Sequence, residues 1–168
     1  MPLRHMLVIE FSAAPSPSGL YRKHSVFRVG ERFIACSPVA EDSWQVKYGR
    51  VGLADAASLT AAAEEIDANP YAERLKPAFA AAHIDYGRAD FGFVGDRLSV
   101  FEINTNPAVS EPGKHDHPVY EGARQRMIDR IAEAIGAEDS SGPAIRIAWR
   151  RPWIRRNKLF AGFVLKQP

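Results

Sequence analysis

The sequence predicts an α+β domain, in which an antiparallel sheet carries helices packed on one of its faces. Two pairs of short segments with alternating polarity each flank a glycine-containing turn, which is typical of β-hairpins. Segments with the apolar spacing of helices separate and follow these hairpins. The length of 168 residues suits one domain with a substantial core, and the single cysteine excludes an intrachain disulfide.

The first part of the chain predicts a strand, a loop and a hairpin. Residues 6–11 form a short apolar run typical of a strand, and the prolines and serines of residues 12–19 indicate a loop. Segments 21–29 and 32–39 flank a two-residue turn that begins with glycine, so we expect them to pair as a hairpin.

Two helices are predicted in the middle of the chain and a third after the second hairpin. The alanine-rich segment that opens at Asp55 is expected to be helical until Asn69 and Pro70 stop it. A second helix is expected over about residues 71–82, with Pro77 in its middle. The third is expected over residues 121–135, with an apolar stripe of Met127, Ile128, Ile131 and Ile135 and with Gly136 as its end.

The second hairpin, expected at residues 87–94 and 98–104, carries the polar residues that bear on function. Because successive side chains of a strand point to opposite faces, residues of the same parity share a face. The apolar face holds Ala89, Phe91, Phe93, Phe101 and Ile103, and the polar face holds Arg88, Asp90, Glu102 and Asn104.

The loop between these strands decides whether their polar residues meet. A two-residue loop at residues 95–96 would place Asp90 opposite an apolar residue and mix the two faces. A three-residue loop, or an equivalent β-bulge, would place Asp90 opposite Glu102 and Arg88 opposite Asn104. We expect this second arrangement because it keeps the two faces distinct.

Two carboxylates that face each other across a strand pair repel unless a cation compensates them. Arg88 would supply part of the compensation, and a divalent cation would supply more. Asp90, Glu102 and Asn104 offer only hard oxygen donors, which favour Mg²⁺ or Mn²⁺ over zinc. Because Mg²⁺ in proteins is often bound by substrate phosphates as well as by carboxylates, we expect a nucleotide to supply its remaining ligands. The alternative is a solvated polar face in which arginine pairs with the carboxylates.

This pattern resembles the closing motif of the ATP-grasp superfamily, whose members include D-alanine–D-alanine ligases, glutathione synthetases and biotin carboxylase-like enzymes. The similar segments are R-A-D-F at residues 88–91 and E-I-N-T-N-P at residues 102–107. The resemblance implies that Asp90, Glu102 and Asn104 coordinate the Mg²⁺ ions that bridge the phosphates of ATP.

The same resemblance implies roles for further residues. Arg88 would be a catalytic residue that faces the transferred phosphoryl group. The strand that contains Ile9, Glu10 and Phe11 resembles the family's hinge strand, whose backbone meets the edge of the adenine. Lys47 ends a segment similar to one in the family and would be a lysine beside the phosphates, and an ordinary exposed lysine is the alternative.

The resemblance covers residues 6 to about 136, so residues 1–137 are expected to be a hinge strand plus the second ATP-binding subdomain of an ATP-grasp fold. The earlier subdomain that would cover the phosphates has no counterpart in the sequence. The implied function is a Mg-ATP-binding module of the type that activates a small carboxylate as an acyl-phosphate for ligation to an amine or thiol. We expect little or no activity unless a second chain, or a second copy, supplies the missing subdomain.

Residues 138–145 are expected to be a linker and residues 146–168 a basic tail. Residues 1–145 carry 15 basic and 20 acidic residues, whereas the tail carries seven basic and none acidic, so balances of −5 and +7 underlie the net charge of +2. The alternative function is a non-catalytic module whose tail binds nucleic acid or an anionic membrane, although a solvated extension is the simpler interpretation. The single cysteine and the lack of a long apolar segment predict a cytoplasmic location.

Overall fold

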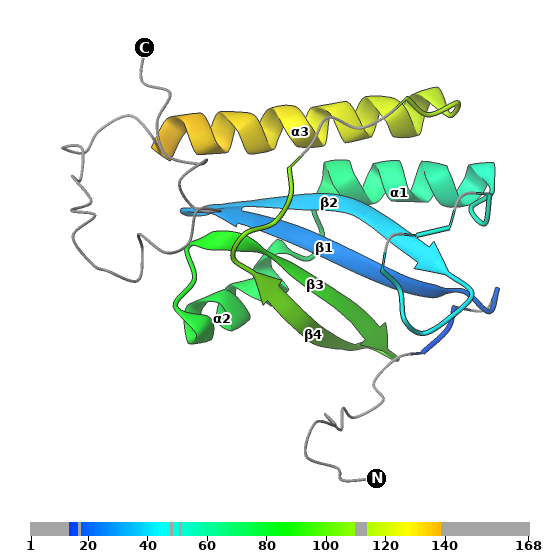
Figure 1. Cartoon of the computed structure of the whole chain (residues 1–168), viewed down its shortest axis with the longest axis horizontal. Helices are drawn as coiled ribbons and strands as arrows, with labels where there is room; N and C mark the ends of the chain where they lie inside the picture. Colours follow the sequence, from blue (N-terminus) through cyan, green and yellow to red (C-terminus); the bar gives the residue numbers. More distant parts are fainter. Residues whose placement is uncertain (1–13, 17, 48, 51, 110–113, 139–168) are drawn as a thin grey trace, which may run out of the picture.

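The computed structural model describes residues 14–16, 18–47, 49–50, 52–109 and 114–138. Four of its strands form one antiparallel sheet with the order β2-β1-β3-β4, and three helices pack against this sheet (Figure 1). The predicted α+β class is therefore confirmed. The elements are β1 (Tyr21–Val29), β2 (Arg32–Glu41), α1 (Ala56–Ala68), α2 (Ala72–Ala82), β3 (Tyr86–Val94), β4 (Arg97–Asn104) and α3 (Pro118–Glu138).

Several sequence-based expectations concern residues outside the described part. These are the strand at residues 6–11, with Ile9, Glu10 and Phe11, and the basic tail at residues 146–168. Of the expected linker, only Glu138 is described, and it is the last residue of α3. No helix among the described residues is long and apolar enough to cross a membrane.

The first hairpin and the first helix form where local signals place them. Strands β1 and β2 pair around a two-residue turn in which Gly30 has a positive φ of 56°. The side chain of Asp55 caps α1 by accepting a hydrogen bond from the backbone N–H of Ser58. Asn69 ends the helix in the left-handed conformation, and its side-chain amide donates a 2.7 Å hydrogen bond to the carbonyl of Phe33 on β2.

The other two helices differ in part from the expectations. Helix α2 continues through Pro77, which lies on its exposed side. Helix α3 starts at Pro118 and runs past Gly136 to Glu138, so the prediction that Gly136 ends this helix is wrong. Of the predicted stripe, Met127 and Ile131 are buried in the core, whereas Ile135 is exposed.

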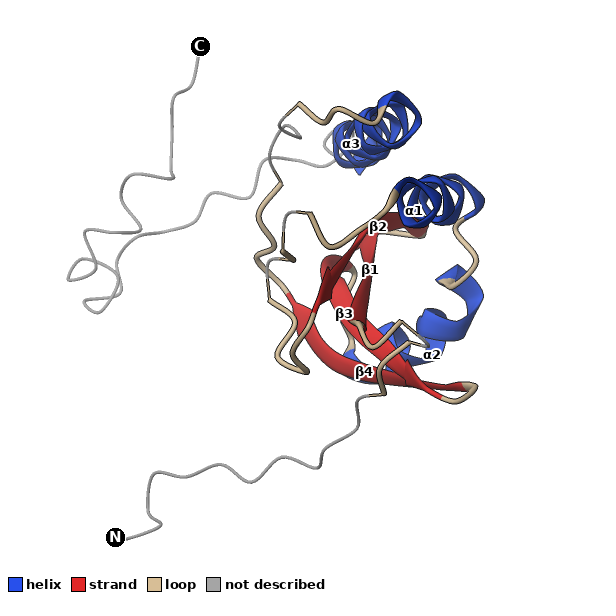
Figure 2. Ribbon diagram, turned by 90° about the vertical axis from the view of Figure 1, so that its right-hand side faces the viewer, coloured by secondary structure: helices blue, strands red, loops and turns tan. Residues whose placement is uncertain are grey.

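The helices cover both faces of the sheet rather than the single face expected. On the face that we call the α3 face, Phe27, Val29, Ile34 and Cys36 pack against apolar residues of α1 and α3. On the opposite face, which we call the α2 face, Val26, Ala89 and Phe91 pack against Leu75 and Phe79 of α2. Figure 2 shows α1 and α3 together near β2, with α2 apart from them and closer to β4.

Helix α1 also reaches the α2 face, because it lies along the side of β2. Its Glu65 carboxylate is 2.7 Å from Nδ1 of His24, which β1 places on the α2 face. The imidazole of His24 is buried among the rings of Tyr71, Phe91 and Phe93, at centroid distances of 5.4, 5.6 and 5.5 Å. This contact ties the first strand to the first helix.

The register of the second hairpin combines the two alternatives derived from the sequence. The loop is the two-residue Gly95-Asp96, which pairs Val94 with Arg97, and a β-bulge then shifts the pairing between Asp90 and Phe91. Phe101 is the surplus residue, because Phe91 pairs with Val100 and Asp90 pairs with Glu102. The predicted pairings of Asp90 with Glu102 and of Arg88 with Asn104 are therefore confirmed, and the bulge produces them.

The bulge also overturns one expectation. Phe101 was expected on the apolar face, but it is 48% exposed. A Cβ atom on Gly92 would lie 2.7 Å from Cζ of Phe101, so the phenylalanine ring covers Gly92 on the same face as Asp90. The other residues of the predicted apolar face behave as expected, because Ala89, Phe91, Phe93 and Ile103 belong to the core with α2.

Candidate functional site

Two rows of side chains cross the α3 face of the sheet at right angles to the strands. In the first row, Ser25 of β1, Asp90 of β3 and Glu102 of β4 are direct neighbours. In the second row, Phe27, Arg88 and Asn104 are direct neighbours. The structure thus brings together four of the predicted site residues, Arg88, Asp90, Glu102 and Asn104.

Asp90 lies at the centre of these rows, with only 2% of its side chain exposed. Its Oδ1 atom accepts hydrogen bonds from the hydroxyl of Ser25, at 2.8 Å, and from Nε of Arg88, at 2.9 Å. Its Oδ2 atom is 3.0 Å from the Nζ atom of Lys23, an ion-pair distance. Oδ2 is buried and accepts no hydrogen bond of good angular geometry from the described residues.

The environment keeps the buried Asp90 ionised. Burial raises the pKa of Asp90, but the ammonium group of Lys23 beside Oδ2, the hydrogen bond from Ser25 and the charge of Arg88 act more strongly in the opposite direction. The net effect is a pKa below the ordinary value of an aspartate. A buried carboxylate of this kind depends on its cationic partners, and the loss of either would be costly.

Glu102 and Asn104 have looser surroundings than Asp90. The side chain of Glu102 is exposed on β4, which is one of the two edge strands of the sheet. The Oδ1 atom of Asn104 accepts a 2.8 Å hydrogen bond from the backbone N–H of Asn106, which shapes the turn after the strand. A carboxamide oxygen has two lone pairs, so this hydrogen bond leaves acceptor capacity on Asn104.

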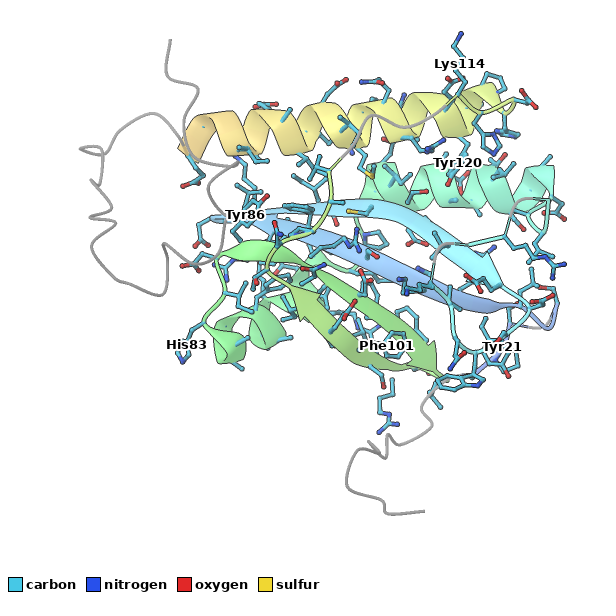
Figure 3. The ribbon with its side chains drawn as sticks, viewed as in Figure 1. Tyr21, His83, Tyr86, Phe101, Lys114 and Tyr120 are labelled. Atoms are coloured by element: carbon cyan, nitrogen blue, oxygen red, sulfur yellow. The ribbon has the colours of Figure 1, made fainter. Side chains whose placement is uncertain are left out.

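A cleft of about 900 Å³ opens beside these rows, and Lys23, Ser25 and Arg88 form part of its lining. Asp90 therefore lies just beneath the cleft surface, covered by its own partners. Apolar residues of α1 and α3 line another part of the cleft. Figure 3 shows Tyr120 on α3, on the side nearest α1, and it shows Phe101 on β4. Glu102 and Asn104 do not belong to the lining.

The cleft is strongly basic. Its described lining contains seven basic side chains and one acidic side chain, that of Asp116. An excess of one charge in a concave surface concentrates ligands of the opposite charge. The basic residues are Arg22, Lys23, Lys47, Arg50, Arg88, Lys114 and Arg124.

Lys47 belongs to the lining of this cleft. Its backbone is fixed from two sides. The N–H of Lys47 donates to the Glu41 carboxylate at 2.9 Å, and its carbonyl accepts a 3.3 Å hydrogen bond from Nζ of Lys23. The side chain of Lys47 is exposed.

Cys36 also contributes to the cleft wall, but its chemistry is that of a buried apolar residue. Burial raises the pKa of the Cys36 thiol to about 12. Because the thiolate is the nucleophilic form, this thiol is inert at neutral pH.

Sequence reasoning did not assign Lys23, Ser25 or the exposed ring of Phe101 to the site. Lys23 and Ser25 lie on the first hairpin, 67 and 65 positions before Asp90, and they reach it only because β1 pairs with β3. Their spacing on alternate positions of β1 places both on the face of Phe27. No local signal in the sequence indicates which hairpin strand would lie beside β3.

The oxygen atoms of Asp90, Glu102 and Asn104 are chemically suitable as ligands for Mg²⁺. Oδ2 of Asp90 and the exposed carboxylate of Glu102 are hard oxygen donors on neighbouring strands, and Asn104 adds a carboxamide oxygen beside them. No group of three or more His, Cys, Asp or Glu side chains that could hold a metal occurs in the described part of the chain. A Mg²⁺ ion here would therefore rely on two carboxylates and on ligands from outside the protein, such as phosphate.

Comparison with known proteins finds no matching family model, no matching curated protein and no matching solved structure.

Proposed function

We propose that this chain is a Mg-nucleotide-binding module of the ATP-grasp type, which binds ATP on the α3 face of its sheet. One observation carries the proposal. Asp90, Glu102, Asn104 and Arg88 come together on adjacent strands, and the residues around Asp90 line a cleft with seven basic side chains and one acidic one. Oxygen donors for a cation beside a basic cleft suit a ligand that combines a cation with phosphates.

The proposed roles follow from these positions. Asp90 and Glu102 would hold Mg²⁺ with the carboxamide of Asn104. Bound Mg²⁺ would neutralise charge on the phosphates during phosphoryl transfer. Arg88 has 28% of its side chain exposed in the cleft wall, so its guanidinium would face the transferred phosphoryl group while Nε stays on Asp90. Lys47 would contact the phosphates from the segment between β2 and α1.

In the proposed reaction, a small carboxylate attacks the terminal phosphorus of ATP and forms an acyl-phosphate and ADP. An amine or thiol then displaces phosphate from the acyl carbon. Because an acyl-phosphate hydrolyses readily in water, the reaction requires a covered site. We therefore propose that this chain catalyses the reaction slowly or not at all by itself and acts with a second chain or a second copy. We place this function in the cytoplasm, because a chain with a single cysteine suits a reducing compartment.

Calorimetric titration with Mg-ATP tests the binding function. We expect the wild type to bind and Glu102→Gln to lose at least about tenfold in affinity, because the variant removes one proposed metal ligand. Glu102 is exposed, so its substitution should leave the stability nearly unchanged.

The matched control is Glu64→Gln, which makes the same change at an exposed position of α1 away from the rows. This variant should bind Mg-ATP as the wild type does. The proposal fails if the wild type binds no Mg-ATP, or if Glu102→Gln binds it as tightly as Glu64→Gln.

A further inference from the structure

The ammonium group of Lys23 occupies a position that a cation ligand of Asp90 would need. Nζ lies 3.0 Å from Oδ2 of Asp90, and only 14% of the Lys23 side chain is exposed. The other oxygen of Asp90 is already held by Ser25 and Arg88. Oδ2 is therefore the only oxygen of this carboxylate still available to a metal, and Lys23 lies against it.

Lys23 and a divalent cation cannot both remain at this oxygen without strong repulsion. A Mg²⁺ ion binds carboxylate oxygens at about 2.1 Å, which would place it within about 5 Å of an ammonium group that is itself 3.0 Å from Oδ2. Arg88 cannot relieve this conflict, because its Nε hydrogen bond is to Oδ1. Lys23 would have to move.

The surroundings of Lys23 allow such a movement. Its side chain is a flexible stem with a compact charge, and it lines the basic cleft. Among the described residues it also donates a 3.3 Å hydrogen bond to the carbonyl of Lys47, a longer and weaker interaction than that with Asp90. A phosphate in the cleft would offer the ammonium group a new anion, whereas a metal ion alone would offer none.

We propose that Lys23 is a built-in substitute cation, which keeps free divalent metal away from Asp90 until a nucleotide arrives. Metal and nucleotide then bind cooperatively, because the phosphates draw Lys23 away from Oδ2 as the metal takes its place. This inference rests on the proposed function and adds a means of regulation at the same site. By linkage, metal must raise the affinity for nucleotide by the same factor by which nucleotide raises the affinity for metal.

The test uses Mn²⁺ alone as the probe, measured by calorimetry and by electron paramagnetic resonance of the free ion. We expect the wild type to bind Mn²⁺ weakly and Lys23→Met to bind it at least about tenfold more tightly, since the variant removes the competing charge. Mn²⁺ should raise the ADP affinity of the wild type by a larger factor than that of Lys23→Met.

Lys76→Met is the matched control, because Lys76 is an exposed lysine of α2 that pairs with Glu73 on the same helix. It should bind Mn²⁺ as the wild type does. If Lys23→Met does not fold, Lys23→Gln takes its place, since glutamine is neutral and retains a hydrogen-bond donor for Asp90.

A thermal melt gives a readout that does not depend on affinity measurements. Lys23→Met should melt at a lower temperature than the wild type in chelator, and Mn²⁺ should raise its melting temperature more than that of the wild type. The inference is overturned if the wild type binds Mn-ADP while neutral variants at position 23 bind Mn²⁺ no more tightly than the wild type. If neither protein binds metal in the presence of ADP, the proposed function fails instead.

Discussion

Asp90 is the residue on which the candidate site depends. It is an ionised carboxylate with almost no exposure to water, and its compensation comes from two strands through Lys23, Ser25 and Arg88. Burial of such a group is unfavourable unless its partners are in place, because the cost of removing a charge from water is several kcal/mol. The stability of the sheet and the chemistry of the site are therefore linked at one side chain.

This linkage predicts a dependence of stability on pH. The pKa of Asp90 is lower in the folded protein than in the unfolded chain, where it is about 4. The ionised side chain therefore contributes stability above about pH 4, and this contribution is lost as the pH falls toward the folded pKa. Asp90→Asn should cost about 3 kcal/mol at pH 7 and should flatten the loss of stability below pH 4.

Urea unfolding between pH 7 and pH 2.5 measures this effect. The control is Asp96→Asn, which changes an exposed aspartate in the β3–β4 turn. We expect the control to follow the wild-type acid profile. An Asp90→Asn profile parallel to that of the wild type below pH 4 would contradict the assignment.

At the scale of elements, the β3–β4 hairpin sets the geometry of the site through close approaches of its backbone. Two of its glycines lie where a Cβ atom would collide, but with different neighbours. A Cβ atom on Gly87 would lie 2.8 Å from the backbone oxygen of Asn104, whereas one on Gly92 would meet the ring of Phe101. A backbone atom in a strand pair cannot move without its partners, while an exposed ring can rotate.

We therefore expect Gly87→Ala to be the more damaging of the two substitutions. It should cost about 2 kcal/mol, because the strands must separate beside Asn104. Gly92→Ala should cost less than about 1 kcal/mol, since Phe101 is 48% exposed and can turn away. Urea unfolding of both variants measures the difference, and equal costs would show that the neighbour's mobility is not the deciding factor.

The helices and strands also show how much of the fold could be predicted from the sequence. Local signals were sufficient for the first hairpin and for α1, because turn and cap residues such as Gly30, Asp55 and Asn69 act on their own neighbours. Gly136 misled the prediction because a glycine ends a helix only where the backbone adopts the left-handed form, and here α3 continues through it. Parity predicts that Asp90 faces Glu102, with either a three-residue loop or a β-bulge, but it does not decide which of the two achieves this pairing.

Longer-range features were beyond prediction for a physical reason. The partners of Asp90 on β1 depend on a strand pairing between residues about 65 positions apart, and no adjacent residue encodes that pairing. The division of the helices between two faces likewise depends on which strands become neighbours. The basic cleft follows from these contacts, because its seven basic residues come from separate segments of the chain.

At the scale of the whole molecule, one thin sheet separates two apolar cores. The core with α1 and α3 contains Ile66, and the core with α2 contains Leu75, and both residues are fully buried. The strands β1 and β2 contribute residues to both cores. If either core were lost, these two strands would lose the packing on one of their faces, and the core on their other face would lose its support. We therefore expect the domain to unfold as a single unit.

This expectation can be tested with one variant in each core. Ile66→Val should cost about 1 kcal/mol and Leu75→Ala about 3 kcal/mol, and the double variant should cost their sum because the residues share no apolar cluster. Urea unfolding followed by far-ultraviolet and near-ultraviolet circular dichroism should give coincident transitions for all three variants. Separate transitions would show that the two cores are independent units.

The bulge at Phe101 means that the second hairpin contains one residue more than a regular strand pair would require. The two-residue loop and a regular ladder would need one residue fewer to bring Glu102 opposite Asp90. If one residue were lost from the segment between Gly95 and Phe101, the ladder could close up by smoothing out the bulge, and the two carboxylates would still face each other. This hairpin can therefore lose one residue without moving its functional end, as long as the strand beyond the bulge stays in place.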